Sequence, residues 1–136
     1  MNKVVVKSTD RKYGVFEKRV RKAAGAALSF LGKDGFLVEV NLVSDAEIKK
    51  LNRRFRKKDK ATNVLSFSEP KNFPFPESRL HCLGEVYLAP DYIRKREENF
   101  SLLVVHGVLH LLGFSHSHGS DRIEMERLED KILQNV

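Results

Sequence analysis

The stretch "FSLLVVHGVLHLLG", Phe100 to Gly113, organises the predicted fold. It overlaps a run without charged residues, Ser101 to Ser117, although 32% of the chain is charged. A segment that is apolar on every side predicts a buried helix rather than a surface helix. Gly113 is expected to end it, because glycine readily takes the left-handed conformation common after a helix C-terminus. Other elements of the chain must therefore cover this helix.

The flanking sequence predicts alternating helices and strands. Apolar residues at helical spacing run from 15 to 31, and β-branched residues from Phe36 predict a strand. Further strands are expected at 62–67 and from Leu83. A length of 136 residues favours one domain, residues 1–136, with one core. We therefore expect an α/β (α+β) fold with a small sheet.

Local signals predict where the helices begin and which faces they bury. "SDAE" at Ser44 is a capping box, which binds the N–H groups of a helix's first turn. Pro90 suits a first turn, and Ser120 is expected to cap the last helix. Three prolines between residues 70 and 76 predict a long loop. The expected buried stripes comprise Val15, Phe16, Val20, Ala23, Ala24, Ala27, Leu28 and Leu31 on the first helix, Ile48, Leu51 and Phe55 after Ser44, and Met125, Leu128 and Ile132 on the last.

Charge and cysteine content narrow the class of protein. A net charge of +7 favours an anionic partner, nucleic acid or an anionic membrane surface, although many basic proteins bind neither. Eight of the 25 Lys and Arg residues lie within residues 49–60. A lone cysteine, Cys82, excludes an intrachain disulfide and favours a reducing, cytoplasmic setting. No apolar run has the ~18–20 residues of a membrane span or resembles a signal peptide, so no membrane partner is expected.

Three histidines next to the apolar segment have the spacing of a metal site. His106 and His110 are one helical turn apart on one face, where two imidazoles can bind one metal at about 2.0–2.1 Å. The turn at Gly113 lets His116 fold back as a third ligand, and a water would complete an open, catalytic site. Three hydrogen-bonded core histidines are disfavoured, because the segment contains no carboxylate partner. We predict zinc, with nickel or copper as alternatives, and His118 as the alternative third ligand.

The same spacing occurs in the metzincin proteases, His-Glu-x-x-His-x-x-Gly-x-x-His. Their general base is the glutamate that follows the first histidine, and Gly107 stands at that place here. A peptidase is therefore disfavoured, unless a carboxylate such as Glu85 or Asp121 lies within ~3 Å of the water on the metal.

These residues resemble the YbeY family, the metal-dependent endoribonucleases of ribosomal RNA maturation. "HGVLHLLGFSH" matches the family's histidine motif, and Ser115 stands where bacterial members often have aspartate. "LNRRFRKKDKATNVLSF", "LGEVYLA" and "MERLE" resemble further family blocks, in order from Leu51 to Glu129. The resemblance implies a small mixed β-sheet with surrounding helices, a zincin-like site in which His106, His110 and His116 bind the metal on the buried helix, and Arg56 as the catalytic arginine.

The resemblance also implies a biological role. The expected activity is cleavage of single-stranded RNA in 16S rRNA 3′-end maturation and ribosome quality control, with the small ribosomal subunit as partner. A metal on three neutral imidazoles either lowers the pKa of a bound water towards ~7 or polarises a phosphoryl oxygen. The planar, permanently charged Arg56 suits the charge of a phosphoryl transition state. Weaker contacts with the RNA backbone are expected from Arg53, Arg54, Lys57, Lys58 and Lys60.

Two questions stay open at this point. The attacking group is either hydroxide or the RNA 2′-OH, since a metal serves both routes. Two other functions also remain as alternatives: a metallopeptidase-like amide hydrolase, and a non-catalytic RNA-binding ribosome-assembly factor with a structural metal.

Overall fold

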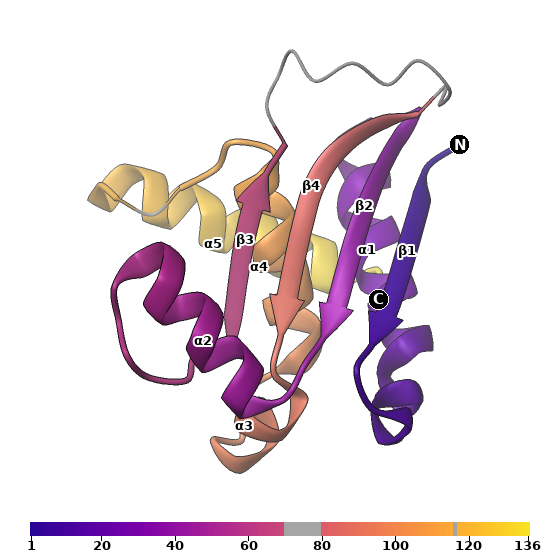
Figure 1. Ribbon diagram of the computed structural model, residues 1–136. Coiled ribbons are helices and arrows are strands. Elements are labelled where there is room, and N and C mark those ends of the chain that lie inside the picture. Colours follow the sequence, from indigo (N-terminus) through magenta and orange to yellow (C-terminus); the bar gives the residue numbers. More distant parts are fainter. Residues whose placement is uncertain (70–79, 116) are drawn as a thin grey trace.

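A four-stranded sheet runs through the middle of the computed structural model, which describes residues 1–69, 80–115 and 117–136. The strand order is β1-β2-β4-β3 (Figure 1). β1, β2 and β4 are parallel to one another, whereas β3 pairs antiparallel with β4. The sheet is therefore mixed. Its strands are β1 (Lys3–Ser8), β2 (Phe36–Leu42), β3 (Val64–Ser68) and β4 (His81–Leu88).

Helices cover both faces of the sheet. In Figure 1, α1 (Glu17–Phe30), α4 (Phe100–Leu111) and α5 (Gly119–Leu133) lie behind it, and α2 (Asp45–Arg56) lies in front of it near β3. A 3-10 helix, η1 (Arg11–Phe16), precedes α1, and the short helix α3 (Pro90–Lys95) precedes α4. α4 contacts β3, β4, α1 and α5, so the predicted burial of the apolar helix is confirmed. Within the described ranges, no helix is both long and apolar enough to cross a membrane.

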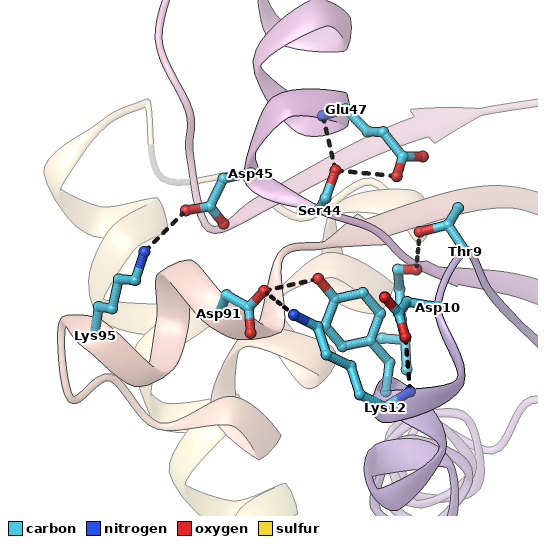
Figure 2. Close-up of polar contacts among 10 residues, drawn as sticks. Thr9, Asp10, Lys12, Ser44, Asp45, Glu47, Asp91 and Lys95 are labelled. Carbon is cyan, nitrogen blue, oxygen red and sulfur yellow. Dashed lines mark hydrogen bonds and ion pairs between the residues drawn. The ribbon is translucent and has the colours of Figure 1, made fainter.

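Several predicted helix boundaries are confirmed. Ser44 caps α2: its Oγ accepts a hydrogen bond from the Glu47 N–H at 3.2 Å and donates to Glu47 Oε1 at 3.0 Å (Figure 2). Pro90 is the first residue of α3. Gly113 follows α4 with a φ of +97°, a conformation that favours glycine. The proline-rich loop predicted from residue 70 lies outside the described residues.

Three details differ from the predictions. Ser120 lies within α5, whose N-cap is His118. Val15 is 79% exposed, because it belongs to the 3-10 helix η1 and therefore does not follow the period of the α-helix that comes after it. Phe55 is 55% exposed, because it sits at the last turn of α2 and only partly covers Phe67, with the two ring centroids 5.1 Å apart.

β1 was not predicted, although it forms one edge of the sheet. Its burial pattern does not alternate: three partly buried valines lie between exposed ends, and Val4 and Val6 pack against the core. Its pairing partner, β2, comes after α1 in the chain. Lys3 pairs with Leu37, 34 residues further on. A short strand whose partner is this remote carries little local signal, because most of its stabilisation comes from pairing.

Candidate active site

His106 and His110 lie side by side on the last turns of α4, as their spacing predicts. Their Nε2 atoms are 3.0 Å apart, and their ring centroids are 4.5 Å apart with an interplanar angle of 69°. Both side chains are only partly buried, although most of the helix around them is fully buried. The two imidazoles therefore lie where the buried helix reaches the surface.

A carboxylate from α5 holds the first of these histidines. Glu129 Oε2 is 3.0 Å from Nδ1 of His106, and the Glu129 residue is only 7% exposed. When Nδ1 carries its proton towards this carboxylate, the Nε2 lone pair is directed at Nε2 of His110. Sequence reasoning missed Glu129 as a site residue. The sequence contains one indication of this role: Glu129 is four residues after the core residue Met125, and residues four apart share one face of a helix.

The donor set fits a divalent metal. Two imidazole nitrogens bound at about 2.0–2.1 Å to one tetrahedral ion lie about 3.3 Å apart, close to the 3.0 Å between the two Nε2 atoms. A carboxylate behind a ligating histidine is also a common companion of metal sites. His116, the predicted third ligand, lies outside the described residues. Among the residues that are described, no group of three or more His, Cys, Asp or Glu side chains is arranged to hold a metal.

Gly107 has a packing reason to be a glycine. A Cβ atom there would lie 2.7 Å from Cγ1 of Val86 and 3.3 Å from Oγ of Ser66. The Ser66 hydroxyl also donates to the Gly107 carbonyl at 3.0 Å. α4 therefore approaches β3 and β4 too closely for any side chain at this position. The glutamate of the metzincin proteases could not be accommodated here without moving the helix away from the sheet.

Glu85 and Asp121, the two carboxylates that could replace the missing general base, do not line the histidine pocket. Val86 faces α4, so Glu85 and Tyr87 on either side of it point to the opposite face of the sheet. There Tyr87 donates a hydrogen bond to Glu85 at 2.8 Å. Burial raises the pKa of Glu85, and burial together with that hydrogen bond raises the pKa of Tyr87 to about 12. Asp121 is likewise absent from the pocket lining.

Arg56 shares a pocket with both histidines. The pocket has a volume of about 330 Å³, and its lining comprises Arg56, Thr62, Asn63, Val64, Leu65, Ser66, Ser68, His106 and His110. α4 supplies the two imidazoles, the end of α2 supplies the guanidinium, and β3 supplies the wall between them. The sequence blocks that contain these groups are therefore adjacent in space. The contribution of the β3 residues was not predicted.

Local structure at the end of α2 keeps Arg56 at the rim of this pocket. Lys57 ends the helix in the left-handed conformation, with a φ of 58°. Asn52, which is 2% exposed, donates from Nδ2 to the Lys60 carbonyl at 2.9 Å and so fastens the following loop to the helix. A small core beneath α2 anchors it to the sheet through Val43, Ile48, Leu65 and Ala89.

The other basic residues of this block lie elsewhere. Arg53 lines a separate groove of about 300 Å³ with Lys49 and Lys50. The guanidinium of Arg54 lies 5.2 Å from the ring centroid of Phe55, on the other side of the helix. Lys57, Lys58 and Lys60 are exposed on the loop after α2 and do not line the histidine pocket. Of the eight basic residues between 49 and 60, Arg56 is the one that lines this pocket in the described structure.

Comparisons with known proteins agree on one family. A family model described as "Endoribonuclease YbeY" matches residues 5–136. A protein of the same name from Persephonella marina is 32% identical over 145 residues, covering 100% of this chain and 94% of the relative. The one from Aquifex aeolicus is 35% identical over 144 residues, covering 99% and 92%. The solution structure of TM1509 from Thermotoga maritima matches with a TM-score of 0.60 at 26% identity, covering 97% of this chain and 87% of that one.

Proposed function

Because the chain belongs to the YbeY family of endoribonucleases, we propose that it cleaves RNA in the pocket between α4, β3 and the end of α2. One observation carries this proposal: His106, His110 and Arg56 come from segments fifty residues apart and line the same pocket. A cation site and a guanidinium that line one pocket suit a phosphodiester, whose charge increases on the phosphoryl oxygens during attack.

The proposed metal ligands are His106, His110 and His116, with zinc as the favoured ion and nickel or copper as alternatives. When bound, the metal supplies Lewis acidity to a phosphoryl oxygen and lowers the pKa of a water. The chain itself supplies orientation. Glu129 sets the tautomer of His106 and keeps its ring in place, and the buried body of α4 fixes the distance between the two imidazoles.

Arg56 is the proposed transition-state stabiliser. It has five N–H donors in a rigid, planar fork and keeps its charge at any physiological pH, so it can hold two phosphoryl oxygens at once. The neighbouring basic residues act differently in this proposal. Arg53, Arg54, Lys57, Lys58 and Lys60 are exposed, and they attract the RNA backbone without contacting the reacting phosphate.

The proposed substrate is single-stranded RNA, and the proposed setting is the 3′ end of 16S rRNA on the small ribosomal subunit. The net charge of +7 supports a polyanionic substrate. A peptide substrate is disfavoured by the packing of Gly107 against Val86, which leaves no room for the general base of the metzincin proteases.

The deciding experiment is incubation of the purified protein with single-stranded and duplex RNA, before and after removal and return of zinc. We expect cleavage of the single strand only, lost with the metal and recovered with it. Products with 2′,3′-cyclic phosphates would indicate attack by the 2′-OH, and products with 3′-hydroxyls would indicate attack by hydroxide. A folded, metal-loaded protein that binds RNA without cutting it would instead be an assembly factor.

Two histidine variants test the third ligand separately. His116→Ala should lose most of the bound metal, whereas His118→Ala should keep it, as measured by metal content after dialysis. The reverse result would assign the third ligand to His118.

A further inference from the structure

β3 forms an edge of the sheet, and the hydrogen bonds at its two ends show which of its residues bond to β4. Ala89 N–H donates to the Asn63 carbonyl at 3.1 Å, and Glu69 N–H donates to the Leu83 carbonyl at 3.1 Å. Both bonds belong to the register that joins Val64 to Leu88. In an antiparallel pair, hydrogen-bonded and non-hydrogen-bonded residues alternate, so the odd-numbered residues of β3 bond to β4.

The even-numbered residues therefore direct their backbone groups away from β4. These residues are Val64, Ser66 and Ser68, and all three line the pocket with the histidines. The open side of the strand and the wall of the candidate active site are thus the same surface. In the described parts of the chain, no strand pairs with β3 on this side.

Some of these edge groups already have partners. The N–H of Val64 donates to Oδ1 of Asn63 at 2.7 Å, and the hydroxyl of Ser66 donates to the Gly107 carbonyl. No hydrogen bond to another described residue engages the outward backbone groups of Ser66 or Ser68. Residues two apart on a strand are about 6.7 Å apart, so the edge presents a short row of donors and acceptors to the pocket.

We propose that this open edge of β3 holds the substrate strand, with the backbone N–H and C=O groups of Ser66 and Ser68 bound to successive nucleotides. This inference rests on the proposed function and adds to it how RNA is recognised. The N–H groups suit phosphate oxygens. The carbonyls need a donor, and the donor that a sugar–phosphate backbone offers is the ribose 2′-OH, so the edge favours RNA over DNA.

Ser68→Pro is the sharpest variant for this proposal. Proline removes the outward N–H without removing a ladder hydrogen bond, and edge strands tolerate proline with its ring towards solvent. Phe67, which precedes it, already has the extended conformation that proline requires of its neighbour. Ser68→Ala is the comparison variant, because it deletes the exposed hydroxyl and keeps the N–H.

We expect Ser68→Pro to raise KM for a single-stranded RNA about tenfold with little change in kcat, since one hydrogen bond to a charged group is worth about that factor in binding. Ser68→Ala should raise KM less than Ser68→Pro does, and the difference between the two variants reports the contribution of the N–H. Circular dichroism and thermal melting would verify that both variants are folded. A folded Ser68→Pro protein with unchanged KM would overturn the proposal.

A second measurement does not depend on cleavage. Amide chemical shifts of the full chain would be followed during titration with a short single-stranded RNA, with DNA of the same sequence and with an unrelated extended peptide. We expect the amides of Ser66 and Ser68 to shift with RNA, more than with DNA, while those of Leu65 and Phe67 stay in place. This alternation would support the inference even if the protein proved not to cut RNA. A response to peptide alone, or shifts without alternation, would rule it out.

Discussion

At the scale of single residues, the chemistry of the pocket depends on how His106 is held. A histidine offers either ring nitrogen to a ligand, and its partner at the other nitrogen decides which one. Here that partner is Glu129, which comes from a helix that begins after the histidine motif ends. Burying a carboxylate is costly unless it is hydrogen-bonded, and the bond that the described structure gives to the nearly buried Glu129 is the one to His106, which orients the ring.

Glu129→Gln should therefore weaken metal binding about 10–100-fold, because an amide oxygen is a poorer acceptor for the ring N–H and orients the imidazole less firmly. Competition with a chromophoric chelator would measure the affinity. Glu124→Gln, on the exposed face of the same helix, is the matched control. Equal affinities for the two variants would show that Glu129 has only a structural role.

Arg56→Lys should lower kcat about 10²–10³-fold while the fold, the bound metal and most of the RNA affinity are kept. Charge is retained in this variant, and the rigid fork that matches two phosphoryl oxygens is lost. Arg53→Lys should show no such drop, because Arg53 lines a different groove. Single-turnover kinetics would separate the two. A fully active Arg56→Lys protein would mean that the residue serves only to attract RNA.

At the scale of helices and strands, the close packing of α4 on the sheet positions the two imidazoles. Gly107→Ala should lower the free energy of unfolding by up to about 2 kcal/mol, since overpacking costs about 1–3 kcal/mol and the gain in helix propensity is about 1 kcal/mol. Gly25→Ala on α1, where an added Cβ meets nothing within 4 Å, should instead stabilise by about 0.5–1 kcal/mol. Urea denaturation would measure both.

A double variant makes the Gly107 prediction specific. Val86→Ala removes the methyl group that lies 2.7 Å from the added Cβ atom. Combined with Gly107→Ala, it should cost less than the sum of the two single changes, because the residues are in contact. Simple additivity would contradict the packing explanation.

A second link between elements joins η1 to α3 and predicts a pH dependence. Asp91 accepts a hydrogen bond from the Tyr13 hydroxyl at 2.8 Å and faces Nζ of Lys12 at 3.2 Å (Figure 2). The Tyr13 bond, and then Lys12, lower the pKa of Asp91. A carboxyl whose pKa is lower in the folded state stabilises the fold above its unfolded pKa of about 3.9, and this stabilisation is lost as the pH falls through the folded value.

Asp91→Asn should thus lower the free energy of unfolding by about 1 kcal/mol at pH 7. The difference from wild type should shrink progressively below about pH 4, where the wild-type carboxyl becomes protonated. Urea titrations at neutral and acidic pH would test this. Asp130→Asn, at an exposed position, should change stability by less than about 0.5 kcal/mol at either pH. A destabilisation by Asp91→Asn that is equal at both pH values would rule out the linkage.

At the scale of the whole molecule, eight of the 25 Lys and Arg residues are grouped on one segment, of which Arg56 lines the pocket. All eight Lys and Arg residues between 49 and 60 are exposed, on α2 and the loop that follows it. RNA binding should therefore weaken steeply with salt, with a log–log slope of about −0.7 for each phosphate contact on a single strand.

Two double variants localise this effect. Lys57→Gln with Lys58→Gln should flatten the slope by about 1.4, whereas Lys18→Gln with Lys22→Gln, on the exposed face of α1, should leave it unchanged. Fluorescence anisotropy at several salt concentrations would give the slopes. If the two pairs had equal effects, the attraction would be a property of the net charge and not of this surface.

Features that depend on neighbours along the chain could be predicted from the sequence alone. The buried α4, its end at Gly113, the cap at Ser44 and the pairing of His106 with His110 all follow from spacings within one turn or one helix. The family resemblance predicts that Arg56 and the histidines serve one function. The distance between them in space does not follow from the sequence.

Contacts between groups far apart in the chain became evident in the folded protein alone. β1 acquires a partner beyond α1, Glu129 reaches His106 from another helix, and the even-numbered edge of β3 becomes a wall of the pocket. The physical reason is that such contacts depend on how faces of separate elements pack, and a local pattern does not contain that information. Phe55 illustrates the limit, because helical periodicity placed it on the buried face while the packing of α2 on the sheet ends before its ring is covered.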